Sequence, residues 1–321
     1  MGSRCLWQSE TLLATIQCSF QNFASRADMI IREKTGVFEL LFATKGSVLP
    51  RILPRIITVS LLSFLLVWID IFVASLPHLE AAPFAVFGIA LSLFLGFRNN
   101  AAYERWWEGR RLWGQLVADM RALARDCAMF LPHDATRREV LHLALDFLHL
   151  HRANLRRTKV PDASQNWSGV DFTPEAHPPC AALNAANLAI AKAAPDGFAR
   201  KALSERLSSI ALSQAGCERI ATTPLPYVYS LLVFRTTYLY CLLVPFALLE
   251  GAAWMTPIFV AIIAYVFFGL AEVTEELAQP FGETVNGLPL DAICRTVEIS
   301  IAPHLGTPPP SALAPQGYYL S

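Results

Sequence analysis

Four apolar runs constrain this chain more than any other feature of its sequence. The first, residues 56–76, is long enough for a helix that crosses a hydrocarbon core of about 30 Å. It contains Asp70, which costs roughly 2.5–3.5 kcal/mol at the centre of a span, but its Leu, Ile, Val and Phe side chains outweigh that cost at about −0.3 to −0.6 kcal/mol each. The other runs cover residues 82–97 and about 227–249 and 254–270. The sequence therefore predicts an all-α polytopic membrane protein with four transmembrane helices.

Composition agrees with a membrane protein and narrows the classes of function. Charged residues make up 16% of the chain, against about 25% in soluble domains, and the formal net charge of zero argues against a nucleic-acid partner. The seven cysteines form no CxxC pair, so they predict neither a disulfide framework nor a zinc site. No GxSxG, Walker, HExxH or GxGxxG motif occurs. We therefore expect no enzyme, no cofactor and no metal, and we interpret His142, His149 and His151 as solvated or core residues.

The distribution of Lys and Arg predicts the orientation of the spans, because these residues gather on the cytoplasmic side. They precede the first span and follow the second, whereas the connections 77–81 and 250–253 contain none. Both termini are therefore expected in the cytoplasm and the protein in the cell membrane. The predicted segments are an N-terminal extension without order (1–28), an N-terminal segment with two spans (29–97), a cytoplasmic helical region (98–223), two further spans (224–271) and a cytoplasmic C-terminal segment (272–321).

Two rows of side chains, each with a spacing of four residues, run along the second span. Gly88, Ser92 and Gly96 form a row of small residues, and Ile89, Leu93 and Phe97 form a bulky row beside it. Such a helix can pack closely on one flank and present three apolar side chains on the next. Periodicity alone favours an ordinary membrane helix with one packing face over a helix that surrounds an axis with its copies.

Charged side chains inside the spans need partners. Arg235 lies within the third span, and Asp70 is the candidate partner by depth. An ion pair that locks the two spans together is favoured, and a charge in an ion pathway is the alternative. Glu272, Glu275 and Glu276 share one face at the end of the fourth span; a solvated face is the default, and an acidic vestibule that attracts cations is the alternative.

Three separated blocks then carry a family resemblance. The runs FLGFRNNAAYERWWEGRRLWGQLV, GCERIATTPLPYVYSLLVFRTTYLY and EELAQPFGETVNGLPLDAIC resemble, in this order, blocks of bacterial bestrophins. The likeness extends over about residues 29–300. It implies a homopentameric ion channel with one pore on the five-fold axis, in contact with membrane lipid. The family's apolar neck falls on Ile89, Leu93 and Phe97, the bulky row found from spacing, and a lower cytoplasmic constriction falls near Phe198.

The resemblance does not determine which ion is conducted or what activates conduction. Animal members have an acidic run after a PFGE-like element, which forms a calcium clasp; here Pro280–Glu283 is followed by TVNGL, so calcium activation is not expected. An uncharged neck does not select the sign of a monoatomic ion. The family favours chloride or other anions, and a cation-selective channel of the same fold is the alternative. A membrane scaffold or sensor without conduction, or a secondary transporter, would be the competing class.

Overall fold

The computed structural model describes residues 29–30, 46–158, 167–315 and 319–320; the predicted extension 1–28 lies outside them. The described residues fall into two compact units. The span unit comprises residues 46–115 and 212–280, and the polar unit comprises residues 29–30, 116–158, 167–211, 281–315 and 319–320. The elements are β1 (Met29–Ile30), α3 (Leu49–Phe72), α4 (Ala81–Phe130), α5 (Asp134–Arg156), α6 (Pro178–Ala193), α7 (Gly197–Thr222), α8 (Tyr227–Ala252), η1 (Ala253–Met255), α9 (Thr256–Leu277), α10 (Leu290–Leu305) and β2 (Tyr319–Leu320). The fold is helical apart from β1 and β2, two-residue strands that pair antiparallel.

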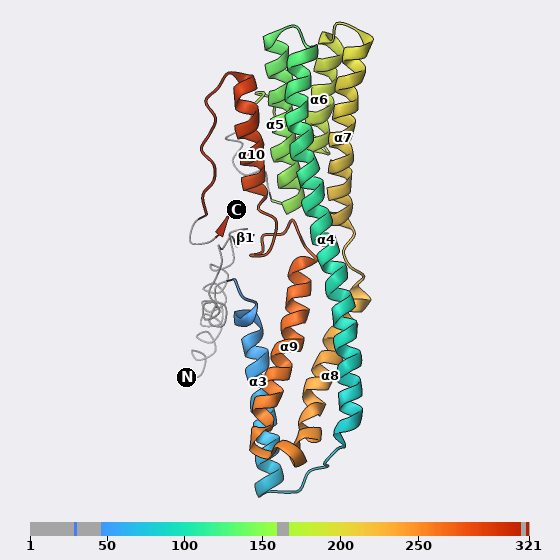
Figure 1. Cartoon of the computed structure of the whole chain (residues 1–321), viewed down its shortest axis with the longest axis vertical. Helices are drawn as coiled ribbons and strands as arrows, with labels where there is room; N and C mark the ends of the chain where they lie inside the picture. Colours follow the sequence, from blue (N-terminus) through green and yellow to red (C-terminus); the bar gives the residue numbers. More distant parts are fainter. Residues whose placement is uncertain (1–28, 31–45, 159–166, 316–318, 321) are drawn as a thin grey trace, which may run out of the picture. The chain divides into compact units, whose positions relative to one another are not determined.

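The span unit is a bundle of α3, α8, α9 and the first part of α4 (Figure 1). Three of its stretches are long and apolar enough to cross a membrane, Leu49–Phe72, Ala81–Phe130 and Tyr227–Leu277. The last stretch holds both α8 and α9, between which the chain turns at Ala253 with a φ of 42°. A positive φ is unusual for a residue with a Cβ, so this backbone breaks the helix sharply.

The core of the span unit is formed by one buried stripe from each helix. α3 packs against α9 and α8, and α8 packs against α9. The buried side chains are Ile52, Ile56, Val59, Leu91, Leu95, Val233, Tyr240, Cys241, Val244, Val260, Ala264, Phe267 and Phe268. The rest of each helix surface is largely apolar and exposed in the single chain, as expected where lipid or another subunit covers it.

α4 continues through the abrupt change of polarity at Arg98. The sequence contains no proline between Pro83, in the first turn, and Pro132, two residues after the helix ends. Proline is tolerated in a first turn but cannot continue a helix, so the two prolines delimit the 50 residues of α4. α4 and α7 each contribute residues to both units.

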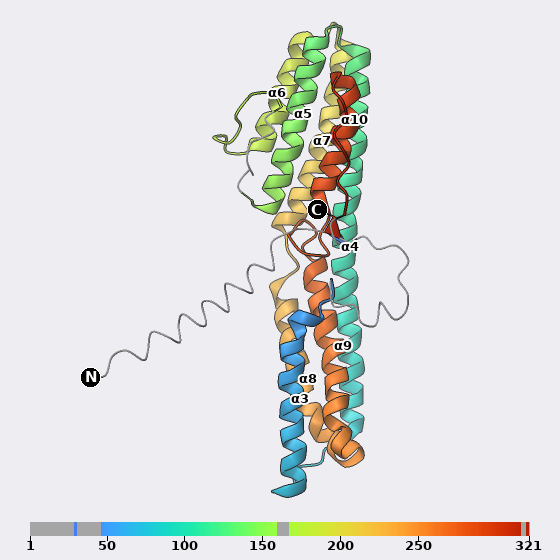
Figure 2. The same cartoon turned by 90° about the vertical axis from the view of Figure 1, so that its left-hand side faces the viewer.

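The polar unit is built around α5, which packs against α6 and α10 (Figure 2). Charged contacts fasten α10 to α5. Arg152 and Arg156 both bind the carboxylate of Asp291, the second with an N–O distance of 2.6 Å. His149 Nε2 lies 2.8 Å from the buried carboxylate of Glu298. Asp291 and Glu298 thus hold side chains of α5 that are themselves largely buried.

His151 gives the polar unit a predicted sensitivity to acid. Its ring is buried and stacks on Phe147 with centroids 5.7 Å apart. Burial, and secondarily the charge of His177, lowers the pKa of His151 from 6.5 to about 3. The unfolded chain therefore binds a proton at pH 5 that the folded chain excludes, so stability is lost as the pH falls from 6.5 toward 3. Between pH 7 and 5 we expect this residue to lower the free energy of unfolding by about 2 kcal/mol.

Hydrogen exchange of α5 amides at pH 7 and pH 5, corrected for intrinsic rates, measures this loss. His151→Phe keeps an aromatic ring and should remove the extra pH dependence, whereas the exposed His133→Ala should leave it. Equal pH dependence in wild type and His151→Phe would contradict the assignment.

Candidate functional site: an outward apolar row on α4

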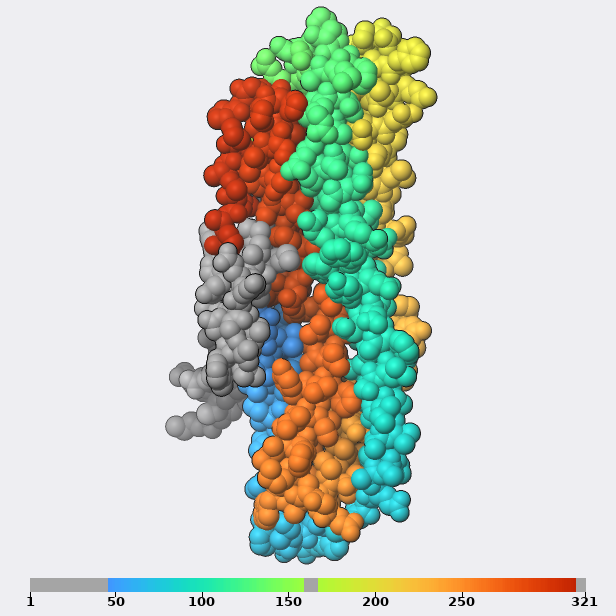
Figure 3. Space-filling model, viewed as in Figure 1, coloured from blue at the N-terminus to red at the C-terminus, as the bar shows by residue number. Residues whose placement is uncertain are grey.

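α4 presents two different apolar faces within the span unit. Leu91 and Leu95 point into the core and are only 4% and 1% exposed. Ile89, Leu93 and Phe97 point away from it and are 69%, 58% and 63% exposed. The outward row, as we call these three residues, therefore lies on a continuous strip of the helix that no part of the described chain covers. In Figure 3, α4 forms much of the visible surface at the lower right.

The neighbouring row of small residues does not act as one packing face. An added Cβ on Gly88 would lie 2.6 Å from Tyr240 Oη, so this glycine allows α8 to approach α4 closely. Gly96 has no such neighbour within 4 Å, and Ser92 is exposed and donates a hydrogen bond to the carbonyl of Ile89. Close approach inside the chain thus depends on Gly88 alone among the three.

Arginine side chains balance the acidic residues at the end of α9. Glu275 Oε2 accepts a hydrogen bond of 3.0 Å from Arg98, whose guanidinium also reaches Ser230 Oγ at 2.8 Å. The other two glutamates pair with arginines of α3. Glu276 pairs with Arg51, and Glu272 pairs with Arg55 at 3.4 Å and with Arg51 at 3.7 Å. Three guanidinium groups therefore offset three carboxylates. Glu272 and Glu276 are thus ion-paired and largely buried rather than solvated, whereas the side chain of Glu275 is paired and still 56% exposed.

Arg105, which lies on α4 eight residues after Phe97, binds the C-terminal ends of α7 and α9. Its guanidinium donates to the carbonyls of Ala278 at 2.6 Å and Thr223 at 2.5 Å, and also to that of Ile220. The last carbonyls of a helix have no partner within it and carry the negative end of its dipole, so one cation satisfies α7 and α9 together. This role was not predicted, and the only signal for it was the position of Arg105 in a block that carries the family resemblance.

The structure does not bring Asp70 and Arg235 together. Asp70 accepts a hydrogen bond from the Leu76 amide at 2.7 Å and lies 3.2 Å from His78 Nε2. Asp70 is near the end of α3 that leads into the connection to α4, and Leu79 in that connection bonds to Phe246 of α8. Arg235 is eleven residues from Phe246, about 16 Å along the helix, so the two charges differ in depth.

Phe198 lies in the first turn of α7 with its side chain almost fully exposed. Asp196 Oδ1 accepts a 2.8 Å hydrogen bond from the Ala199 amide, which caps the helix and fixes where Phe198 emerges. Phe198 and the outward row belong to different compact units.

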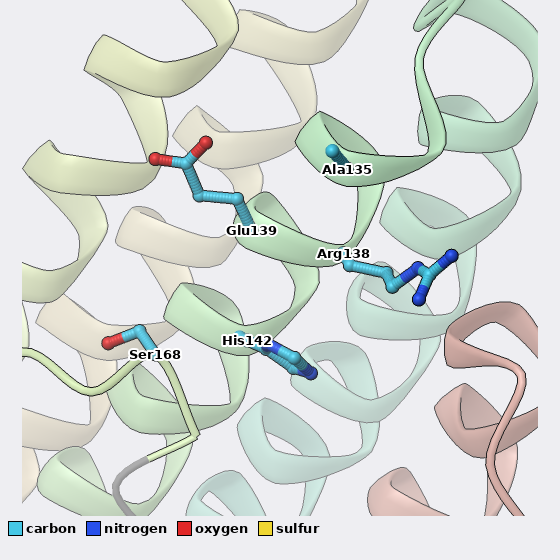
Figure 4. Close-up of a pocket in the computed structure, with 5 residues that line it drawn as sticks. All are labelled: Ala135, Arg138, Glu139, His142 and Ser168. Atoms are coloured by element: carbon cyan, nitrogen blue, oxygen red, sulfur yellow. The ribbon is translucent and has the colours of Figure 1, made fainter.

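A surface depression of about 390 Å³ was not predicted from the sequence. It lies in the polar unit and is lined by Ala135, Arg138, Glu139, His142 and Ser168 (Figure 4). Burial lowers the pKa of His142, and the charge of Asp146 opposes this. Among the described residues, no group of three or more His, Cys, Asp or Glu side chains could hold a metal ion.

A bundle of long apolar helices with an uncovered apolar row defines the class as an α-helical membrane protein. The family model described as "Bacterial/Fungal Bestrophin protein" matches residues 29–303, and the chain belongs to this family.

Named relatives and solved structures agree with the family. A voltage-dependent anion channel-forming protein of Mesorhizobium japonicum is 42% identical over 309 residues, covering 92% of this chain and 98% of the relative. A protein of the same description from Escherichia coli K12 is 37% identical, covering 85% and 93%. The crystal structure of a bacterial bestrophin homologue from Klebsiella pneumoniae matches with a TM-score of 0.74 and 32% identity, covering 80% of this chain and all of that one.

Proposed function

We propose that this chain is the subunit of a homopentameric, anion-conducting channel of the cell membrane. The observation that carries the proposal is the outward row, Ile89, Leu93 and Phe97, exposed on the helix whose other face forms the core. Three bulky apolar side chains stacked along a membrane helix must be covered by lipid or by other subunits, and five copies around an axis would turn the three side chains toward one another. The family and the anion-channel names of the relatives support conduction over an enzymatic function.

The proposed topology has four crossings per subunit. α3 and the first part of α4 cross once each, and the apolar stretch Tyr227–Leu277 crosses twice because it turns at Ala253. The absence of Lys and Arg from the connections 77–81 and 250–253 supports placing both outside. The N-terminus, the region 98–223 and the C-terminal segment then lie in the cytoplasm.

The proposed gate is the neck that the outward row would line. A narrow apolar constriction expels water, so an ion crosses only when the neck widens or becomes hydrated. Phe198 would form a second apolar ring, on the cytoplasmic side. Neither ring carries charge, so the sign of the conducted ion must be set by charges elsewhere in the channel. The compensated Glu272, Glu275 and Glu276 weaken the alternative of a cation channel fed by an acidic vestibule.

Purified protein in planar bilayers tests the proposal. We expect unitary currents whose reversal potential under a potassium chloride gradient lies toward the chloride equilibrium potential, and native mass spectrometry should give five subunits. Saturable flux without unitary currents would instead indicate a transporter, and silence of an assembled pentamer would favour a scaffold.

A further inference from the structure

Arg235 is an uncompensated positive charge within the proposed membrane region. Every other charged side chain of the described spans lies near an end of its apolar span, and most are paired there, as in the Arg51, Arg55 and Arg98 network and the Asp70–His78 contact. Arg235 lies well inside α8, is exposed, and forms no ion pair or hydrogen bond within the described chain. An arginine at such a position needs water, an anion or another subunit as its surroundings.

Side-chain contacts fix the depth of Arg235 relative to the outward row. α4 and α8 run antiparallel and touch at two levels. Arg98 bonds to Ser230 at 2.8 Å, and Gly88 packs against Tyr240. Arg235 is five residues from Ser230 and from Tyr240 along α8, and Leu93 is five residues from Arg98 and from Gly88 along α4. Arg235 therefore lies level with Leu93, the middle residue of the row.

From this juxtaposition we infer that Arg235 determines the preference of the channel for anions. The inference rests on the proposed function, in which Leu93 faces the pore. α8 then stands directly behind the neck helix, and five copies of Arg235 form a positive ring around the most dehydrated part of the path. The apolar side chains keep water out of the neck, so the field of these charges is poorly screened there. An anion is stabilised in the neck and a cation is excluded, although no charged side chain touches the ion.

The size of the expected effect follows from distance. Ser230 and Tyr240 face α4, so Arg235, five residues from each, points to the far side of α8, and about two helix diameters, roughly 20–24 Å, separate the guanidinium from the pore. A unit charge at that distance, at an effective dielectric constant near 20, favours an anion and disfavours a cation by about three- to fourfold each, so it changes their ratio by about tenfold. Arg235→Gln should therefore lower the chloride-to-potassium permeability ratio by at least about tenfold. Arg235→Lys keeps the charge and should retain the ratio of the wild type.

Reversal potentials in bilayers test the inference on intact pentamers, verified by native mass spectrometry. Lys192→Gln is the matched control, since it removes one exposed cation from α6 in the polar unit and should leave the ratio unchanged. If Arg235→Gln homomers do not assemble, mixed channels with wild-type subunits replace them, and the ratio should fall with each variant subunit incorporated.

The outcomes separate this inference from the proposed function. Wild-type pentamers that carry no current would overturn the channel itself. Wild-type anion currents together with an unchanged ratio in the Gln variant would overturn the role of Arg235 and leave the channel standing. The guanidinium would then serve as an anchor to lipid phosphates, reached by extension of its side chain toward the membrane boundary.

Discussion

Leu93→Ala should raise the current through the channel by roughly ten- to hundredfold, through a higher open probability or a larger unitary conductance. The side chain is exposed in the single chain and, in the proposed neck, meets its four copies across the pore. Shortening it widens the constriction and removes apolar surface, which lowers the free-energy cost of hydrating the neck by about 1.5–3 kcal/mol. Because each 1.4 kcal/mol changes a rate tenfold, the predicted range follows. Single-channel recording measures it.

Leu91→Ala is the matched control two residues away on the same helix. Leu91 points into the core of the span unit, so its truncation leaves a cavity and should destabilise the protein by about 2–5 kcal/mol. Channels that still assemble should have wild-type conductance. Leu93→Ala, by contrast, should leave thermal stability in detergent nearly unchanged. The opposite pattern, with a stability loss at Leu93 and a current change at Leu91, would place the pore on the other face of α4.

The grouping of the outward row on one face could be predicted from the sequence because spacing along a single helix determines it, whereas only the structure shows which way that face points. Residues four apart share a face whatever surrounds the helix, so Ile89, Leu93 and Phe97 stay together, and the structure places all three away from Leu91 and Leu95. The row that includes Gly88 and Gly96 failed as one packing face because close approach also depends on a neighbour, Tyr240, that spacing does not reveal.

Contacts between elements were predicted less well than the elements themselves. The Asp70–Arg235 pair was inferred from the rule that buried charges find partners, but that rule does not say which partner. His78, eight residues along the chain, and the Leu76 amide were available to Asp70 without any helix rearrangement. The balancing of Glu275 by Arg98 was missed for the same reason, since their separation in sequence hides their proximity.

The individual bounds of α6 and α10 were not predicted, for different reasons. The buried positions of α6, which lies within the predicted helical region 98–223, are mostly alanine, whose burial leaves little periodic signal. α10 did carry a usable signal, because its buried residues Leu290, Ile293, Cys294, Val297 and Ile301 recur at helical spacing. Only its first residues, up to Cys294, belong to a block that carries the family resemblance.

Asp291→Ala should destabilise the polar unit by about 3–5 kcal/mol, the largest stability loss that we predict for a charged residue. The carboxylate accepts from both Arg152 and Arg156, and the guanidinium of Arg156 is largely buried. Removing the shared acceptor leaves two cations without compensation on α5 and releases α10, whose first turn contains Asp291. Hydrogen exchange should show α10 amides losing protection before those of α6.

Asp134→Ala is the control for this last prediction. Asp134 also pairs with an arginine, Arg137, but its side chain is exposed and the pair lies within the first turn of α5. Exposed pairs contribute little, so we expect a change of about 0.5 kcal/mol or less. Similar losses in the two variants would mean that α10 is held by its apolar stripe alone. A large loss of stability confined to Asp291→Ala would show that the charged contacts fasten α10 to α5. Any release of α10 from α5 must then break these contacts.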